Sequence, residues 1–356
     1  MDIQLEELGY GGFFASGFEE LGLDGCIPAR VISEHKGAYG VRDACGEYLA
    51  TVTGKQIYGA RGREDYPAVG DWVALGRIGD GRAVIQGLLP RRTLLKRKYS
   101  GGSGAQVIAA NVDTAFVVES AGGNFSPNRV ERYVAIAREG GIRPVIVLNK
   151  IDLVPQEEAQ AMVSSLRERF NGIEVIGTSA VSDGGLGGMK ALVLRGETCC
   201  LLGPSGVGKS TLINRLLGKD AIKTGEISGH TGKGKHTTTA RHVYFLPDGW
   251  ILIDNPGMRE VGMTDAKAGL EDTFAEITAL AGRCRFADCT HVHEPGCAVR
   301  EAVARGELDG GRFDNYLKLS REAEYYEMTS LEKRRKDRET GRFFKRSKKD
   351  LKKRGY

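Results

Sequence analysis

The chain has 356 residues, of which 41% are hydrophobic and 27% are charged, and its net charge is +5. This composition can fill two or three hydrophobic cores, so it excludes a chain that is disordered throughout. No stretch approaches the roughly 18 uninterrupted apolar residues that a membrane span requires, and the first 23 residues lack the basic and apolar regions of a signal peptide. We therefore expect a soluble, cytoplasmic protein of several domains, with no membrane partner.

The positive charge is concentrated at the C-terminus. Residues 331–356 hold thirteen Lys or Arg against four Asp or Glu, a surplus of nine that leaves −4 on the rest of the chain. Such a basic tail is either a solvated extension or an arm that adds salt-sensitive affinity for nucleic-acid phosphates. Both interpretations stay open.

Two predicted units make up the first hundred residues. Residues 1–24 carry apolar side chains at roughly helical spacing, which predicts a short docking helix. Residues 25–99 alternate in short runs between glycine turns, which predicts an all-β barrel of about five strands, either an OB-fold or an SH3-like barrel. The end of this unit is basic and forms a solubilising edge strand or an RNA-facing patch: Arg91, Arg92, Lys96, Arg97 and Lys98.

After a glycine-rich joint at 100–104, apolar strands alternate with helices. This alternation predicts an α/β domain with a parallel sheet over 105–264. A mainly helical third domain, interrupted by a cysteine cluster, follows at 265–330 and precedes the tail at 331–356. The expected strands are 114–118, 144–148, 174–176, 198–202, 240–245 and 250–253, and the expected helices are 128–139, 156–170 and one beginning at 209.

The phosphate-binding pattern G-x-x-x-x-G-K-[ST] occurs at 203–211, after an apolar strand and at the start of a helix. Its glycines let successive backbone N–H groups face the phosphates of a nucleotide. Lys209 would reach the β- and γ-phosphates, and Ser210 would offer its hydroxyl to Mg²⁺. The predicted phosphate contacts are Gly203, Pro204, Ser205, Gly206, Val207, Gly208, Lys209, Ser210 and Thr211.

Two further loops indicate guanine. Residues 149–152 read N-K-x-D after an apolar strand, and the Asp152 carboxylate can accept hydrogen bonds from N1–H and the 2-amino group, an edge that adenine lacks. The Lys150 stem would cover the ring face. A Ser-Ala pair after the next strand suits a loop whose backbone N–H meets the guanine O6. The predicted base contacts are Asn149, Lys150, Ile151, Asp152, Ser179 and Ala180.

A D-x-x-G sequence ends the apolar strand before residue 254. Asp254 would bind Mg²⁺ through water, and the Gly257 N–H would sense the γ-phosphate. A glycine-rich stretch upstream ends in three threonines, one of which should complete the Mg²⁺ shell; we predict Thr239, with Thr238 as the alternative. His236 beside them either positions the attacking water or simply faces solvent.

A compact set of soft donors lies near the C-terminus. Cys284, Cys289, His291 and Cys297 form C-x₄-C-x-H-x₅-C within fourteen residues, which suits tetrahedral Zn²⁺. The odd total of seven cysteines and the lack of a secretion signal argue against a disulfide framework. Four protein ligands would close the shell, so the zinc would be structural. His293 is a near alternative to His291, and unligated buried cysteines are the other interpretation.

The GTPase motifs occur in a circularly permuted order. In most GTPases the phosphate loop comes first and N-K-x-D comes late, whereas here N-K-x-D and Ser-Ala precede the phosphate loop. Because the termini of compact domains lie close together, a permutation can keep the same site. With a barrel before this domain and a Cys-His cluster after it, the chain resembles the RsgA/YjeQ family of small-ribosomal-subunit-dependent GTPases over nearly its full length.

The resemblance implies an OB-fold barrel, a circularly permuted P-loop GTPase domain and a mainly helical zinc-binding domain with its histidine ligand at His291. It also implies binding to 16S rRNA on the 30S subunit, GTP hydrolysis to GDP stimulated by that subunit, and a role in its late maturation; we expect a monomer. Asn255 stands where the family often has Thr, and the lysine-rich tail is longer than the family minimum, which leaves the role of the tail open.

Two other functions fit parts of the sequence. A passive RNA-binding scaffold with a vestigial nucleotide site is opposed by the intact Lys209, Ser210 and Asp254, and a P-loop ATPase is opposed by Asp152. Met258 stands where many GTPases place a water-orienting glutamine, and a thioether does that poorly. We therefore expect slow intrinsic hydrolysis that a ribosomal partner accelerates.

Overall fold

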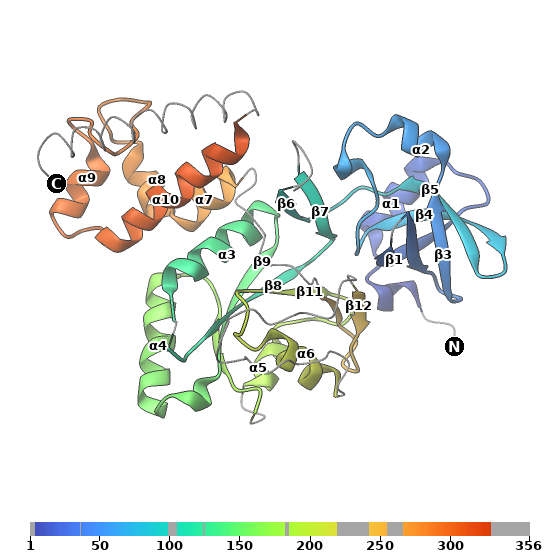
Figure 1. The fold of residues 1–356 in the computed structure, drawn as a ribbon, viewed down its shortest axis with the longest axis horizontal. Helices are drawn as coiled ribbons and strands as arrows, with labels where there is room; N and C mark the ends of the chain where they lie inside the picture. Colours follow the sequence, from blue (N-terminus) through green and yellow to red (C-terminus); the bar gives the residue numbers. More distant parts are fainter. Residues whose placement is uncertain are drawn as a thin grey trace, which may run out of the picture.

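The computed structural model of the chain describes residues 4–35, 37–98, 105–123, 125–181, 185–218, 242–254 and 266–328. Figure 1 shows a β-barrel on one side, a central sheet covered by helices, and a group of helices on the other side. Among the described residues, no helix is long and apolar enough to cross a membrane. The predicted joint at 100–104, the tail at 331–356 and the side chains of Arg97 and Lys98 lie outside the described part of the chain.

The N-terminal segment packs against the barrel in two pieces. η1 (Leu5–Leu8) is a 3-10 turn and α1 (Gly12–Leu21) is an α-helix. Leu8 and Phe14 are buried in one apolar cluster with Trp72, whose ring centroid lies 5.8 Å from that of Phe14. The apolar spacing that predicts a docking helix therefore corresponds to a buried face.

Five strands close into a barrel in the order β1-β2-β3-β5-β4, with β4 returning to β1. β3 and β5 run parallel, and the other neighbours run antiparallel. This strand order, with the short helix α2 (Gly54–Gly59) between β3 and β4, is that of an OB-fold and excludes the SH3-like alternative. The strands are β1 (Ile27–His35), β2 (Ala38–Arg42), β3 (Glu47–Val52), β4 (Trp72–Gly79) and β5 (Arg82–Leu88).

The basic stretch after the barrel lies elsewhere than predicted. β6 (Leu94–Lys98) pairs antiparallel with β7 (Ala105–Ala110), a strand that we did not predict. β6 is thus an edge strand, but of a two-stranded sheet with β7 that is separate from the barrel. The RNA-facing interpretation stays a prediction. Three cations of the stretch form ion pairs: Arg91 with Asp71, Arg92 with Asp113, and Lys96 with Glu64.

The central sheet has the order β10-β9-β8-β11-β13-β12. The first five strands run parallel and β12 runs antiparallel to β13. The phosphate-loop strand β11 thus lies between β8 and β13. The strands are β8 (Thr114–Ser120), β9 (Arg143–Asn149), β10 (Val175–Thr178), β11 (Thr198–Leu202), β12 (His242–Phe245) and β13 (Ile251–Asp254).

Helices cover both faces of this sheet (Figure 1). α3 (Pro127–Glu139) and α4 (Gln156–Arg169) lie on one face, and α5 (Leu186–Ala191) and α6 (Lys209–Leu217) lie on the other. Val117 of β8 belongs to the apolar cluster under α3 and α4, whereas the preceding Phe116 belongs to the cluster under α5 and α6. Burial of both faces explains the nearly continuous apolar strands, and the predicted α/β sheet is confirmed. The helix α5 was not predicted.

A buried arginine links the barrel to the central sheet. Arg30 of β1 is 1% exposed, and its guanidinium donates to the Leu8 and Gly70 carbonyl oxygens and, at 2.7 Å, to Thr198 Oγ1 at the start of β11. Burial lowers the pKa of Arg30 to about 10. Ser33 of the same strand pairs with His242 of β12, so β1 belongs to both the barrel and the sheet.

The C-terminal helices pack against α3. They are α7 (Lys267–Thr273), α8 (Ala275–Ala281), α9 (Ala298–Ala304) and α10 (Gly310–Glu327). A Cβ atom at Gly269 would lie 2.1 Å from the Ala135 carbonyl oxygen, so only glycine permits this close approach of α7 to α3. The Gly269 N–H donates to Glu139 Oε2 at 2.8 Å.

A fully buried carboxylate, Glu131, holds the seam between α3 and the C-terminal helices. It accepts hydrogen bonds from Arg169 Nε at 2.8 Å, Arg312 Nη1 at 3.0 Å and Asn315 Nδ2 at 2.5 Å. A buried charge costs free energy unless it is paired and hydrogen-bonded. These three donors offset that cost for Glu131, and they fix α10 to α3 and α4.

Candidate functional site: a nucleotide site and a cysteine-histidine cluster

The phosphate loop connects β11 to α6. Gly208 has a φ of +98°, and a Cβ atom there would lie 2.4 Å from Asn149 Nδ2. Glycine is therefore needed both for the backbone conformation and for the close approach of the N-K-x-D loop. Lys209 is the first residue of α6, and its ammonium donates to the Gly203 and Pro204 carbonyl oxygens at 2.8 and 2.7 Å. Its side chain therefore folds back over the start of the phosphate loop.

Asn149 joins the N-K-x-D loop to the phosphate loop. Its side chain is fully buried, its Nδ2 donates to the Val207 carbonyl oxygen at 2.8 Å, and its Oδ1 accepts from the Thr178 hydroxyl at 3.0 Å. Lys150 Nζ donates to the Gly206 carbonyl oxygen at 2.6 Å, and its backbone is left-handed with a φ of +61°. Such a conformation is sparsely populated for a non-glycine residue and is typical of functional loops.

The predicted base contacts come together at one edge of the sheet. Ser179 Oγ donates to Asp152 Oδ1 at 2.5 Å, which holds the carboxylate beside the Ser-Ala loop. Parallel strands β9 and β10 pair from Val175 to Thr178, so their two following loops start side by side. The sequence patterns thus locate loops that the fold places together around Asp152, Ser179 and Ala180.

The magnesium side of the site is partly described. β11 and β13 are parallel neighbours, so Asp254 at the end of β13 and Ser210 in the first turn of α6 lie at the same edge of the sheet. His236, Thr238, Thr239, Gly257 and Met258 fall outside the described ranges. Their predicted roles stay predictions.

Two sets of hydrogen bonds that hold the base loops were not predicted from the sequence. Thr178 orients Asn149, and Arg215 of α6 donates from Nε to the Ala180 carbonyl oxygen at 2.9 Å and from Nη2 to the Val181 carbonyl oxygen at 3.2 Å. Thr178 directly precedes the Ser-Ala pair, which is a usable signal. Nothing in the spacing of Arg215 indicates its partners, because they lie 34 and 35 residues away.

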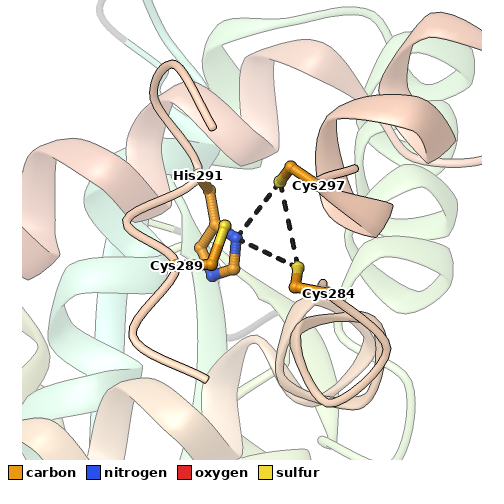
Figure 2. Close-up of side chains that lie close together, drawn as sticks. All are labelled: Cys284, Cys289, His291 and Cys297. Carbon is orange, nitrogen blue, oxygen red and sulfur yellow. Dashed lines mark hydrogen bonds between the residues drawn. The ribbon is translucent and has the colours of Figure 1, made fainter. Parts of the chain in front are cut away.

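The predicted soft donors form one cluster. The donor atoms of Cys284, Cys289, His291 and Cys297 all lie within 4.8 Å of one another, and all seven cysteines, each of them in the described ranges, are free thiols. Cys284 Sγ lies 3.9 Å from Cys297 Sγ and 3.6 Å from His291 Nδ1, which is 3.4 Å from Cys297 Sγ (Figure 2). Zinc–sulfur bonds of about 2.3 Å in a tetrahedron give ligand–ligand edges of about 3.8 Å. The cluster therefore has the dimensions of a metal site.

The histidine of this cluster is His291 and not the alternative His293. His291 is 8% exposed, and its φ of +60° turns the ring toward the thiols. Burial lowers the pKa of His291, which favours the neutral imidazole that a metal requires. His293 is exposed, and its N–H donates to Glu294 Oε2.

Glu294 organises the loop between the ligands and was also missed. Its carboxylate accepts from the Thr290 hydroxyl and from the backbone N–H groups of Thr290, Val292 and His293. The hydrogen bond from the Thr290 hydroxyl, followed by those from backbone N–H groups, lowers the pKa of Glu294. The loop that presents His291 is thus closed around one carboxylate.

The fold and these two sites define a class of protein, the circularly permuted P-loop GTPases, here between an OB-fold barrel and a helical domain with a Cys-His cluster. The chain belongs to the RsgA GTPase family and is a GTP-hydrolysing enzyme; the family model described as RsgA GTPase matches residues 88–264. It is 43% identical over 332 residues to the small ribosomal subunit biogenesis GTPase RsgA of Opitutus terrae, with 90% of each chain covered. It is 40% identical over 357 residues to the small ribosomal subunit biogenesis GTPase RsgA 2 of Vibrio parahaemolyticus, with 98% of this chain and 94% of the relative covered.

Solved structures agree with this assignment. YjeQ from Thermotoga maritima superposes with a TM-score of 0.62 at 27% identity, over 83% of this chain and 97% of YjeQ. YloQ, a circularly permuted GTPase, superposes with a TM-score of 0.61 at 23% identity over 85% of this chain and 97% of YloQ, which bears on the fold alone.

Proposed function

We propose that the protein is a GTPase of late small-subunit maturation, which binds 16S rRNA on the 30S subunit and hydrolyses GTP to GDP faster on that subunit. One observation supports guanine-nucleotide binding: hydrogen bonds of Asn149 and Ser179 connect the N-K-x-D loop to the phosphate loop and to the Ser-Ala loop. Similarity over 90% or more of this chain to small ribosomal subunit biogenesis GTPases supports the ribosomal part.

In the nucleotide site we assign guanine recognition to Asp152, Ser179 and Ala180, and phosphate binding to residues 203–211. Lys209 would stabilise negative charge on the β- and γ-phosphates. Mg²⁺ fits the hydroxyl and carboxylate oxygens at this edge of the sheet, and we assign its binding to Ser210 and Asp254, with Thr239 as the third group. Gly257 is assigned to sensing the γ-phosphate, and His236 to positioning the attacking water.

The cysteine-histidine cluster fits structural Zn²⁺, because three thiol sulfurs and one imidazole nitrogen surround a space with tetrahedral edges. Zinc would fix the fold of the C-terminal domain and take no part in hydrolysis. We propose that this domain, the barrel and the basic tail engage rRNA together, and that the protein acts as a cytoplasmic monomer.

GTP hydrolysis with and without purified 30S subunits, at several salt concentrations, tests this function. We expect slow turnover by the free protein and stimulation of about tenfold or more by 30S subunits. Stimulation should fall as salt rises, because protein–phosphate contacts release counterions and binding to rRNA therefore weakens with salt. Purified 50S subunits serve as the matched control for rRNA in general. Turnover by the free protein that equals turnover with 30S subunits contradicts the proposal.

A further inference from the structure

An arginine on the phosphate-loop helix reaches the base-recognition loop. Arg215 lies on the second turn of α6, the helix that begins at Lys209, and its guanidinium donates to two successive carbonyl oxygens, those of Ala180 at 2.9 Å and Val181 at 3.2 Å. A planar guanidinium can make two such bonds at once with little loss of side-chain freedom for each bond. Ala180 itself is buried, at 6% exposure.

The two carbonyl groups belong to the loop after β10, of which the structure describes residues 179–181, and each of these three residues makes a hydrogen bond. The Val181 N–H donates to Ser179 Oγ at 3.3 Å, and the same hydroxyl donates to Asp152. Arg215 fixes the other side of the backbone at Ala180 and Val181. The Ala180–Val181 peptide is therefore held at its N–H by Ser179 and at its C=O by Arg215, and it directly follows the Ala180 N–H along the chain.

We propose that Arg215 is a positioning residue for guanine recognition, which keeps the Ala180 N–H aimed at the guanine O6. This inference rests on the proposed base-reading role of Asp152 and Ala180. It also means that one rigid helix sets both ends of the nucleotide: its first turn carries Lys209 and Ser210 for the phosphates, and its second turn holds the loop for the base.

Three diphosphates separate a positioning role from a general loss of structure. GDP and inosine diphosphate both carry O6, whereas 6-thio-GDP keeps N1–H and the 2-amino group but replaces O6 with sulfur, a weak acceptor. In Arg215→Gln we expect affinity for GDP and inosine diphosphate to fall about threefold to tenfold, the effect of one hydrogen bond, while affinity for 6-thio-GDP changes less than about twofold. Arg215→Lys retains one donor and should restore part of the loss.

The matched control is Arg143→Gln, because Arg143 also donates to a backbone carbonyl oxygen, that of Leu192, but at the start of β9, the end of that strand opposite the N-K-x-D loop. Its three affinities should equal those of the wild type. Equal losses for all three diphosphates in Arg215→Gln, or no loss for GDP, overturn the role of Arg215. Wild-type protein that binds ADP as tightly as GDP overturns the base-reading function itself, so the two failures are distinguishable.

Discussion

The nucleotide site and the cysteine-histidine cluster are assembled in opposite ways. The nucleotide site gathers groups from residues 149 to 254, at the ends of β9, β10, β11 and β13, which the sheet brings to one edge. The cluster gathers its four donors from fourteen consecutive residues that contain turns but no strand among them, all within the described part of the chain.

The two regions also differ in what holds them. The strands under the nucleotide site are almost fully buried, and protein groups such as Asn149 and Arg215 connect its loops. Within residues 283–297, all of which the structure describes, only His291 and Cys297 are buried. So little apolar burial cannot offset the entropy of ordering such a loop. Protein groups therefore connect the loops of the nucleotide site, whereas the cluster needs a further contribution to its order, which our proposal assigns to zinc.

Removal of a proposed zinc ligand should have the largest effect, on the stability of the C-terminal helices. It also tests whether the cluster and the nucleotide site are independent. In Cys289→Ala we expect loss of about one zinc per chain and melting of the C-terminal helices, because structural zinc contributes on the order of 10 kcal/mol or more of folding free energy. GDP affinity should stay within about twofold. Metal analysis, circular dichroism and GDP titration measure the three quantities.

Cys45→Ala is the matched control, since Cys45 is exposed in the barrel and remote in sequence from the cluster. It should keep its zinc. Full zinc content in Cys289→Ala contradicts the ligand assignment, and a large loss of GDP affinity contradicts the independence of the two sites.

Substitution of Glu131, between α3 and the C-terminal helices, should have the next largest effect, on the stability of those helices. Glu131→Gln removes the buried carboxylate that Arg169 and Arg312 share and leaves them only their more exposed partners, Asp309 and Glu276. Removing one partner of a buried ion pair costs about 3–5 kcal/mol. We expect the free energy of unfolding of the C-terminal domain, measured in urea, to fall by that amount, which lowers the urea midpoint. The exposed Glu301, which lies 4.0 Å from Arg305, gives the control Glu301→Gln, which should leave the urea midpoint unchanged because water screens an exposed ion pair.

Glu131 also connects the two regions, because it lies on α3 beside the central sheet and binds Arg312 of α10. If the two regions are independent, Glu131→Gln leaves GDP affinity unchanged. A parallel fall in GDP affinity would show that the seam transmits changes between them.

Both sites were predictable from the sequence to the extent that their signals are local. The phosphate loop, N-K-x-D and the cysteine spacing are short patterns, each tied to one chemical requirement. The groups that connect them are not local: Arg30 meets Thr198 at a separation of 168 residues, and Arg132 meets Glu322 at a separation of 190. The closure of the barrel, in which β4 pairs with β1, likewise depends on tertiary contacts that alternation cannot reveal.

Substitution of Asp152 in the base-recognition loop should have the third largest effect, on nucleotide affinity and preference. In Asp152→Asn the amide cannot accept from both N1–H and the 2-amino group of guanine as the carboxylate does, so we expect GTP affinity to fall about 100-fold, a cost of one to two charge-assisted hydrogen bonds. Preference should shift toward xanthosine nucleotides, whose base presents a carbonyl oxygen in place of the 2-amino group.

Competition binding with GTP and xanthosine triphosphate measures this shift, and zinc content serves as the internal control because it should not change. An unchanged preference for GTP would refute the base-reading role of Asp152. Glu157→Gln, on the first turn of α4, offers a matched acidic control outside the loop.

The smallest effect concerns the carboxylate that closes the cluster loop. In Glu294→Gln one acceptor oxygen replaces two for the Thr290, Val292 and His293 donors, so we expect zinc affinity to fall by about tenfold or less. Because hydrogen bonding lowers the pKa of Glu294 in the folded protein, its contribution is fully present above the unfolded pKa of about 4.3. It declines from there and is lost as pH falls through the lower folded pKa. The melting temperatures of the wild type and Glu294→Gln should therefore differ at pH 7 and converge in acid. A difference that stays constant down to pH 3.5 would mean that the charge of Glu294 does not stabilise the loop, and that the metal alone holds it.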